Sequence, residues 1–198
     1  MRALLILTVV YFLSYGPLEP AIPVYTRNHL GAGAGAYGAM WSALGAGALV
    51  GLLMIPALSR LRAGVVNAAG ALLWGIALLP LLAVNMLPAA LVIMFVGGLV
   101  WAPYVATEVT VIQRCVPPEQ HGAAFGARRA VIVASSPTGA ALGGVLLEHY
   151  SSLSVVGLSA AACIVAGGIC LALPSVRDAA PPARRSSCSQ QEIPAASR

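Results

Sequence analysis

Charged side chains are scarce in this sequence of 198 residues, and lysine does not occur in it. Charged residues make up 9% of the chain and hydrophobic residues 59%, and the mean hydropathy is +0.88. A soluble domain of this size must cover its surface with polar groups, which this composition cannot supply. The scarcity of charge therefore excludes a soluble protein, and we predict an integral protein of the lipid bilayer.

Motifs for catalysis and metal binding are also missing. The sequence has no glycine-rich phosphate loop, no GxSxG motif, and no paired histidine and acid at metal-ligand spacing within an apolar segment. These absences argue against an enzyme, against ATP-driven transport by this chain alone, and against a cofactor or a metal. The cysteines lack CxxC spacing, so we expect no disulfide framework. The net charge of +5 comes from dispersed arginines, which favours lipid headgroups over nucleic acid as partners.

Six apolar stretches are long enough to cross the membrane, since about 30 Å of hydrocarbon takes roughly 20 helical residues. They cover approximately residues 3–25, 35–58, 64–84, 88–107, 130–147 and 154–174. We therefore expect an all-α membrane protein with a bundle of six transmembrane helices over residues 1–174. The segment 175–198 is polar and rich in proline and serine, and is expected to be a disordered cytoplasmic tail.

The arginines predict the orientation of these spans. If the N-terminus is inside, ten of the eleven arginines lie on the inner side: Arg2, Arg60, Arg62, Arg114, Arg128, Arg129, Arg177, Arg184, Arg185 and Arg198. Only Arg27 then lies outside. Because positively charged loops stay in the cytoplasm, we expect a multi-pass protein of the plasma membrane with both termini cytoplasmic.

Residues 11–27 combine a carboxylate, Glu19, with three prolines, Pro17, Pro20 and Pro23, in an otherwise apolar segment. An ionisable group at membrane depth is costly and normally faces a cavity or a partner. Proline removes a backbone donor, and membranes tolerate the resulting helix break mostly where protein or water satisfies the freed carbonyl. We predict that this segment lines a pathway in which Glu19 takes up and releases a proton. The alternative is a structural hydrogen bond from Glu19 to the broken backbone.

The two halves of the chain share a short pattern of aromatic, small residue and proline, with a glutamate four positions after a tyrosine. The residues concerned are Tyr15, Gly16, Pro17 and Glu19 in one half and Trp101, Ala102, Pro103, Tyr104 and Glu108 in the other. Three spans per half would place the second copy in the opposite orientation, as in inverted repeats with a binding site at their interface. Coincidence is the alternative. Pro103 and Pro137 are expected to break later spans.

Two GxxxG steps indicate close helix packing in corresponding places of the two halves. Gly47 and Gly51 form one in the second span, and Gly139 and Gly143 form the other in the fifth span.

Three further segments carry a family pattern. Residues 16–23 read GPLEPAIP, residues 113–119 read QRCVPPE and are followed by Gly122, Phe125 and Gly126, and the fifth span contains Pro137, Gly139, Gly143 and Gly144. These segments resemble helix seven, the loop between helices ten and eleven, and helix eleven of major facilitator superfamily transporters. The similarity is closest to bacterial drug and siderophore exporters of the macrolide efflux and enterobactin groups. Residues 3–174 thus resemble the C-terminal six-helix half of such a transporter. Ser59 and Ala123 depart from the family's usual aspartate and arginine.

The resemblance implies a secondary active transporter, or half of one. We expect proton-coupled efflux of small amphipathic compounds by antiport, as in multidrug resistance. A complete transporter of this family has two six-helix bundles, so the resemblance also implies a second bundle as partner, either another copy in a homodimer or a separate N-terminal half. The alternative is a truncated fragment or helper subunit that packs against another membrane protein without transporting anything.

Two groups of side chains are the candidates for function. The predicted proton and substrate pathway consists of Glu19, Tyr11, Tyr15, Trp101 and Tyr104, since aromatic rings beside a carboxylate suit an amphipathic or cationic compound. Packing is the alternative for the aromatic residues. The predicted cytoplasmic gate includes Arg114 and pairs Glu108 with Arg60, Arg62, Arg128 or Arg129. Contact of Glu108 with the cavity and solvation at the interface are the alternatives.

Overall fold

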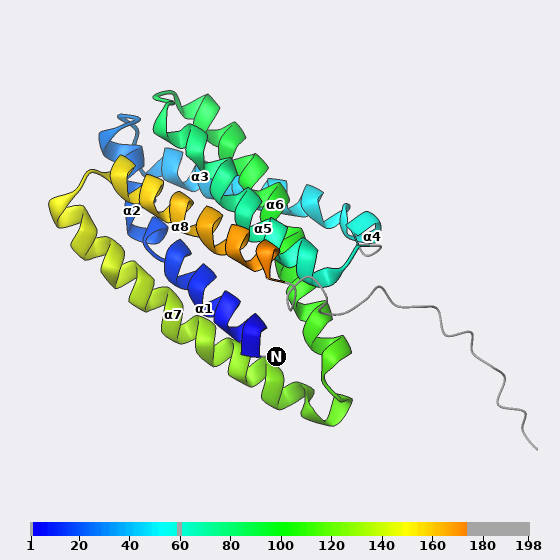
Figure 1. The fold of residues 1–198 in the computed structure, drawn as a ribbon. Coiled ribbons are helices and arrows are strands. Elements are labelled where there is room, and N and C mark those ends of the chain that lie inside the picture. Colours follow the sequence, from blue (N-terminus) through cyan, green and yellow to red (C-terminus); the bar gives the residue numbers. More distant parts are fainter. Residues whose placement is uncertain (1, 59–60, 174–198) are drawn as a thin grey trace, which may run out of the picture.

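The computed structural model describes residues 2–58 and 61–173, and every regular element within these ranges is a helix. Arg60 and the predicted tail 175–198 lie outside the described residues. The helices are α1 (Arg2–Tyr15), α2 (Leu18–Asn28), α3 (Ala34–Leu52), α4 (Ile55–Leu58), α5 (Ala63–Leu78), η1 (Leu79–Leu82, a 3-10 helix), α6 (Leu87–Cys115), η2 (Pro118–Gln120, a 3-10 helix), α7 (His121–His149) and α8 (Ser152–Ala172). Figure 1 shows the long helices packed side by side along one general direction.

Four described segments are long and apolar enough to cross a membrane: Gly64–Leu82, Leu87–Thr110, Pro118–His149 and Ser152–Ala172. They correspond to the last four expected spans. The first two expected spans are each divided, one into α1 and α2 and the other into α3 and α4. The number of candidate spans is therefore smaller than the six that the sequence predicts.

The first division lies at Gly16 and Pro17, between α1 and α2. Proline cannot donate a backbone hydrogen bond, so helical pairing is interrupted where Pro17 and Pro20 follow one another closely. The predicted breaks at Pro103 and Pro137 are not observed, because α6 and α7 continue through these residues. A single missing donor is tolerated inside a membrane helix when neighbouring groups compensate for it. Pro23 likewise lies within α2.

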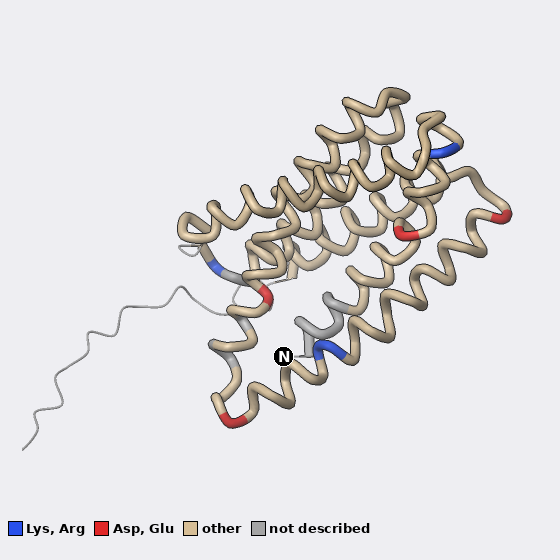
Figure 2. Tube along the Cα trace, turned by 180° about the vertical axis from the view of Figure 1, so that it is seen from behind, with Lys and Arg blue, Asp and Glu red and all other residues tan. Residues whose placement is uncertain are grey.

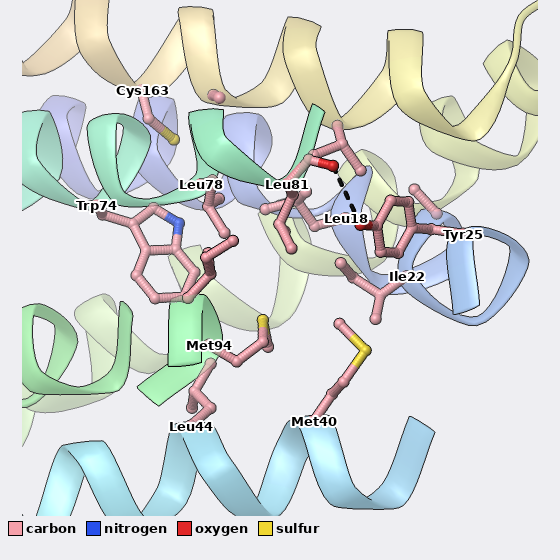
Figure 3. Close-up of a cluster of buried hydrophobic side chains, with 14 of the residues drawn as sticks. Leu18, Ile22, Tyr25, Met40, Leu44, Trp74, Leu78, Leu81, Met94 and Cys163 are labelled. Carbon is pink, nitrogen blue, oxygen red and sulfur yellow. Dashed lines mark hydrogen bonds between the residues drawn. The ribbon is translucent and has the colours of Figure 1, made fainter. Parts of the chain in front are cut away.

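The helices form a layered bundle in which α6 packs on α3 and α5, and α8 packs on α5, α1 and α2. The long helix α7 runs along α1 and α2. Buried side chains from α2, α3, α5, α6 and α8 meet in the cluster drawn in Figure 3. There the Tyr25 hydroxyl donates to the carbonyl oxygens of Leu81 and Val84, at 3.0 Å each. This buried tyrosine fastens the end of α2 to the turn after α5.

Both GxxxG steps lie at tight helix contacts. A Cβ atom at Gly47 would overlap the carbonyl of Phe95, so the backbones of α3 and α6 touch there. A Cβ atom at Gly16 would come within 2.6 Å of the Cα of Gly139, where α1 meets α7. Small residues permit this approach, which is how membrane helices gain packing energy without a hydrophobic driving force.

Charged residues are few and lie toward the two ends of the bundle, with long uncharged helical stretches between them (Figure 2). This distribution suits a chain whose middle is surrounded by hydrocarbon, because a charge is costly at that depth.

Candidate functional site

Glu19 lies in the first turn of α2, directly after the interrupted helix. Its side chain is exposed on the bundle, and the Ser136 hydroxyl of α7 donates a hydrogen bond of 3.0 Å to the Glu19 Oε1 atom. A carboxylate near a helix N-terminus also interacts favourably with the helix dipole. This hydrogen bond joins the segment that contains Pro17 to the segment that contains Pro137. Glu19 therefore bonds to a side chain of another helix.

The exposed face of α2 leads from Glu19 through Pro23 to Arg27, at steps of four residues. Pro23 and Arg27 line a cavity of about 350 Å³, together with Tyr37 and the residues at the start of α3. Glu19 lies eight residues before Arg27, which is roughly 12 Å along a helix. The acid thus lies on the same face of α2 as this cavity and about two turns deeper.

Aromatic side chains lie on the elements near Glu19. Tyr15, which is half-buried, ends α1 four residues before Glu19. The rings of Tyr15 and Trp74 have centroids 6.0 Å apart, and those of Tyr37 and Trp41 are 6.3 Å apart. These ring contacts join α1 to α5 and link two residues of α3.

The other predicted pathway aromatics lie inside the bundle. Tyr11 and Tyr104 are both 1% exposed, and their ring centroids are 4.5 Å apart, so α1 and α6 meet through them. Trp101 is half-buried and packs at the edge of the core. In this conformation, a compound outside the bundle reaches Glu19 and the edge of Tyr15, whereas Tyr11 and Tyr104 are covered.

Glu108 forms an ion pair that links α6 to α7. The distance between its Oε2 atom and the Nη2 atom of Arg128 is 2.5 Å, and the side chains are 1% and 15% exposed. Asn67 of α5 donates to the Tyr104 carbonyl nearby, at 3.4 Å. A charge so deeply buried needs its partner, because the desolvation cost is otherwise uncompensated.

The other arginines predicted for a gate differ in their exposure and in whether the structure describes them. Arg62 and Arg129 are exposed, Arg60 lies outside the described residues, and the side chain of Arg114 lies outside them as well. Among the described residues, no three His, Cys, Asp or Glu side chains are grouped as a metal ion would require.

The model of the Major Facilitator Superfamily matches residues 4–195. This chain belongs to the major facilitator superfamily. No curated protein and no solved structure matches it. Members of this superfamily are membrane transporters, and the all-helical fold with apolar helices long enough to span a bilayer agrees with that general role.

As a major facilitator protein, the chain has two polar centres: the exposed Glu19–Ser136 contact and the buried Glu108–Arg128 pair. The sequence identified both glutamates. It missed Ser136 as a partner of Glu19, and it missed Trp41 and Trp74. The available signal was the presence of tryptophans within apolar spans, since a buried indole N–H normally needs a hydrogen-bond acceptor.

Proposed function

We propose that this major facilitator chain is the six-helix half of a proton-coupled exporter of small amphipathic cations, related to the drug and siderophore exporters. The observation that carries this proposal is Glu19, an acid that the fold leaves exposed between α2 and α7 and supports with Ser136. At membrane depth such a group is tolerated where it faces a water-filled path or a partner. The half-buried Tyr15, four residues before Glu19, provides an aromatic ring that can attract a cation.

In this proposal the bundle consists of two inverted repeats, α1 to α5 and α6 to α8, with α1 and α2 acting as one span and α3 and α4 as another. The helix contacts support this arrangement, because equivalent contacts occur in the two repeats. The pairing of α1 with α7 corresponds to that of α6 with α3, and the pairing of α8 with α1 and α2 corresponds to that of α5 with α6. The GxxxG step of each repeat contacts the first helix of the other.

A second six-helix bundle would cover the face that carries Glu19, either as another copy of this chain or as a separate N-terminal half. The two bundles would lie in the plasma membrane with their termini in the cytoplasm, and the translocation path would run between them. Since rocking of two bundles exposes a central site to one side at a time, Glu19 would meet both compartments in turn.

The proposed cycle exchanges one proton for one cationic substrate at the Glu19 carboxylate. The ionised carboxylate binds the cation from the inner side, and the aromatic rings hold its apolar part. After the path opens outward, a proton from outside binds a carboxylate oxygen and neutralises the charge, so the cation leaves. When the path opens inward again, the proton leaves to the inner side and the carboxylate is ionised for the next cation. The Glu108–Arg128 pair would close the inner end between α6 and α7 while the path is open outward.

Transport by reconstituted protein tests this scheme. We expect vesicles that contain the chain to move an amphipathic cation under a pH gradient, and Glu19→Gln to abolish this flux, because glutamine cannot exchange a proton. Glu148→Gln is the matched control, since Glu148 is exposed at the far end of α7. Undiminished pH-driven flux in Glu19→Gln would remove Glu19 from the mechanism. Failure of the unmodified chain to produce gradient-dependent flux would favour a non-transporting subunit instead.

A further inference from the structure

A small cavity inside the bundle lies between α1, α2, α3, α5 and α6. Its walls include the rings of Tyr15, Trp41 and Trp74, with Leu44 and Met94 beside them. Figure 3 shows Trp74, Leu44 and Met94 turned toward one another in this region. The free space is about 10 Å³. This is close to the space that the centre of a single water molecule occupies in a protein cavity.

Two of the residues that line this cavity each carry a hydrogen-bond donor that has no acceptor among the described residues. The indole Nε1 atoms of Trp41 and Trp74 are buried and have no hydrogen-bond partner within the described part of the chain. Trp74 is only 2% exposed, and its nitrogen lies on the side of the ring that faces Leu78, another wall residue (Figure 3). Nearly all buried polar atoms in native proteins have a partner, counting ordered water. Two unpartnered donors around one space therefore indicate an acceptor that enters it.

The position of the cavity connects it to Glu19. Tyr15 and Trp41 are half-buried and form its outer edge, whereas Trp74 forms its inner wall. Tyr15 is the last residue of α1, and Glu19 follows it by four residues in the first turn of α2, so this tyrosine connects the cavity wall to the segment that carries the acid. A compound held at Glu19 can therefore place one small atom past the Tyr15 and Trp41 rings without its whole body entering the bundle.

We propose that Trp41 and Trp74 are specificity-determining residues whose indole N–H groups donate to a carbonyl oxygen of the transported compound. This inference rests on the proposed function and defines the substrate class further, as aromatic cations that carry a hydrogen-bond acceptor. A space of this size can admit about one water molecule, and a carbonyl oxygen would take its place because the two have similar size. The replacement gains affinity only where the new acceptor reproduces the hydrogen bonds of the water.

A matched pair of probes tests the acceptor requirement. Tetraphenylphosphonium is an aromatic cation without an acceptor, and (4-acetylphenyl)triphenylphosphonium differs from it by one carbonyl group. We expect the acetyl compound to bind the purified chain roughly five- to tenfold more tightly in isothermal titration calorimetry. Trp41→Phe and Trp74→Phe each remove one donor but keep an aromatic face, so each should reduce this preference toward equality. The affinity for tetraphenylphosphonium should stay within about twofold.

Tyr150→Phe is the control, because Tyr150 is exposed at the end of α7 and does not line this cavity, and it should retain the full preference. Equal affinities of the two probes for the unmodified chain, or a preference that survives both cavity variants, would overturn the proposal. Glu19→Gln should weaken both probes by the same factor. If neither probe binds the unmodified chain, the cationic substrate class fails, and this proposal fails with it.

A second measurement covers the case in which a variant does not fold. The chain contains three tryptophans, so its ¹⁵N-labelled form gives three indole N–H signals in NMR. We expect the acetyl probe to shift two of them beyond the shift produced by tetraphenylphosphonium, because the new acceptor changes the shielding of the bonded proton. Identical responses to the two probes would overturn the proposal.

Discussion

Glu108 and Arg128 are the two members of a charge pair at a contact between α6 and α7 that is otherwise small. The chain turns sharply at η2 between α6 and α7. The ion pair therefore limits the separation of these two helices near the turn. The pair matters for stability mainly because it is buried. Removal of one partner leaves the other charge in a medium that solvates it poorly, which costs free energy. This makes the pair suitable as a latch that holds one conformation.

Removing the arginine alone should cost more stability than removing both charges. We expect Arg128→Ala to lower the free energy of unfolding by about 2–4 kcal/mol, because the buried Glu108 carboxylate loses an ion-pair partner. The double variant Glu108→Ala with Arg128→Ala should recover part of that loss. Thermal unfolding in detergent measures both.

Arg129→Ala is the control for the Arg128 prediction, since Arg129 is exposed at the adjacent position of the same helix. Its effect should stay within about 0.5 kcal/mol. A loss of equal size at both arginines would contradict a specific role for the Glu108–Arg128 pair.

The helix α7 is attached to α1 and α2 through small residues at the interrupted first span. Gly16 meets Gly139 there, and Gly143 meets Pro17. The hydrogen bond between Ser136 and Glu19 is formed on the same two surfaces. Close backbone contact therefore positions the hydroxyl of α7 at the carboxylate of α2, and any change that separates these helices should also affect the acid.

Gly16→Ala should separate α1 from α7, because the added Cβ would lie 2.6 Å from the Cα of Gly139 and neither backbone can yield easily. We expect a loss of about 1–3 kcal/mol in stability, the usual cost of overpacking. Gly122→Ala is the matched control, since a Cβ there meets nothing within 4 Å. Alanine also favours a helix over glycine by about 1 kcal/mol, so the control should be neutral or stabilising. Thermal unfolding midpoints that fall equally in both variants would show that the contact is unimportant.

At the level of the entire chain, the face around Glu19 differs from an ordinary lipid-facing surface because it exposes an acid and a serine between apolar helices. The cavity at Arg27 opens on the same side of α2. A partner bundle on this face would enclose a polar path, whereas the outer side of α8, with exposed Leu158, Val165 and Ile169, suits hydrocarbon.

Cysteine crosslinking should distinguish these two sides if the partner is a second copy. In a background without the four natural cysteines, Thr138→Cys on the exposed side of α7 should form a disulfide-linked dimer in the membrane on mild oxidation. Val165→Cys on α8 is the control and should remain monomeric, because its side chain would face lipid. Crosslinking at both positions, or only at Val165, would place the partner elsewhere, and a chain that stays monomeric throughout would exclude the homodimer.

Much of the architecture was predictable because a membrane imposes strict local requirements. Apolar length and the family pattern at residues 16–23 indicated the class of protein and the last four spans, whereas the orientation drawn from the arginines and the role of Glu19 stay predictions. The predicted breaks at Pro103 and Pro137 were wrong because one missing backbone donor does not by itself end a helix whose neighbours support it. At Gly16 and Pro17, a glycine and a second proline nearby add to the effect, and the helix is interrupted.

Composition and segment length indicated a helical membrane protein, because they depend only on each residue and its neighbours along the chain, and the segments 16–23 and 113–126 resembled the major facilitator superfamily. The folded arrangement was needed to see that Arg128 pairs with Glu108, that Tyr11 and Tyr104 are covered while Glu19 is exposed, and that Trp41 and Trp74 line one cavity. The physical reason is that these outcomes depend on how each helix is rotated about its axis against its neighbours. That rotation is set by the close packing of small residues from distant parts of the chain, such as Gly16 against Gly139.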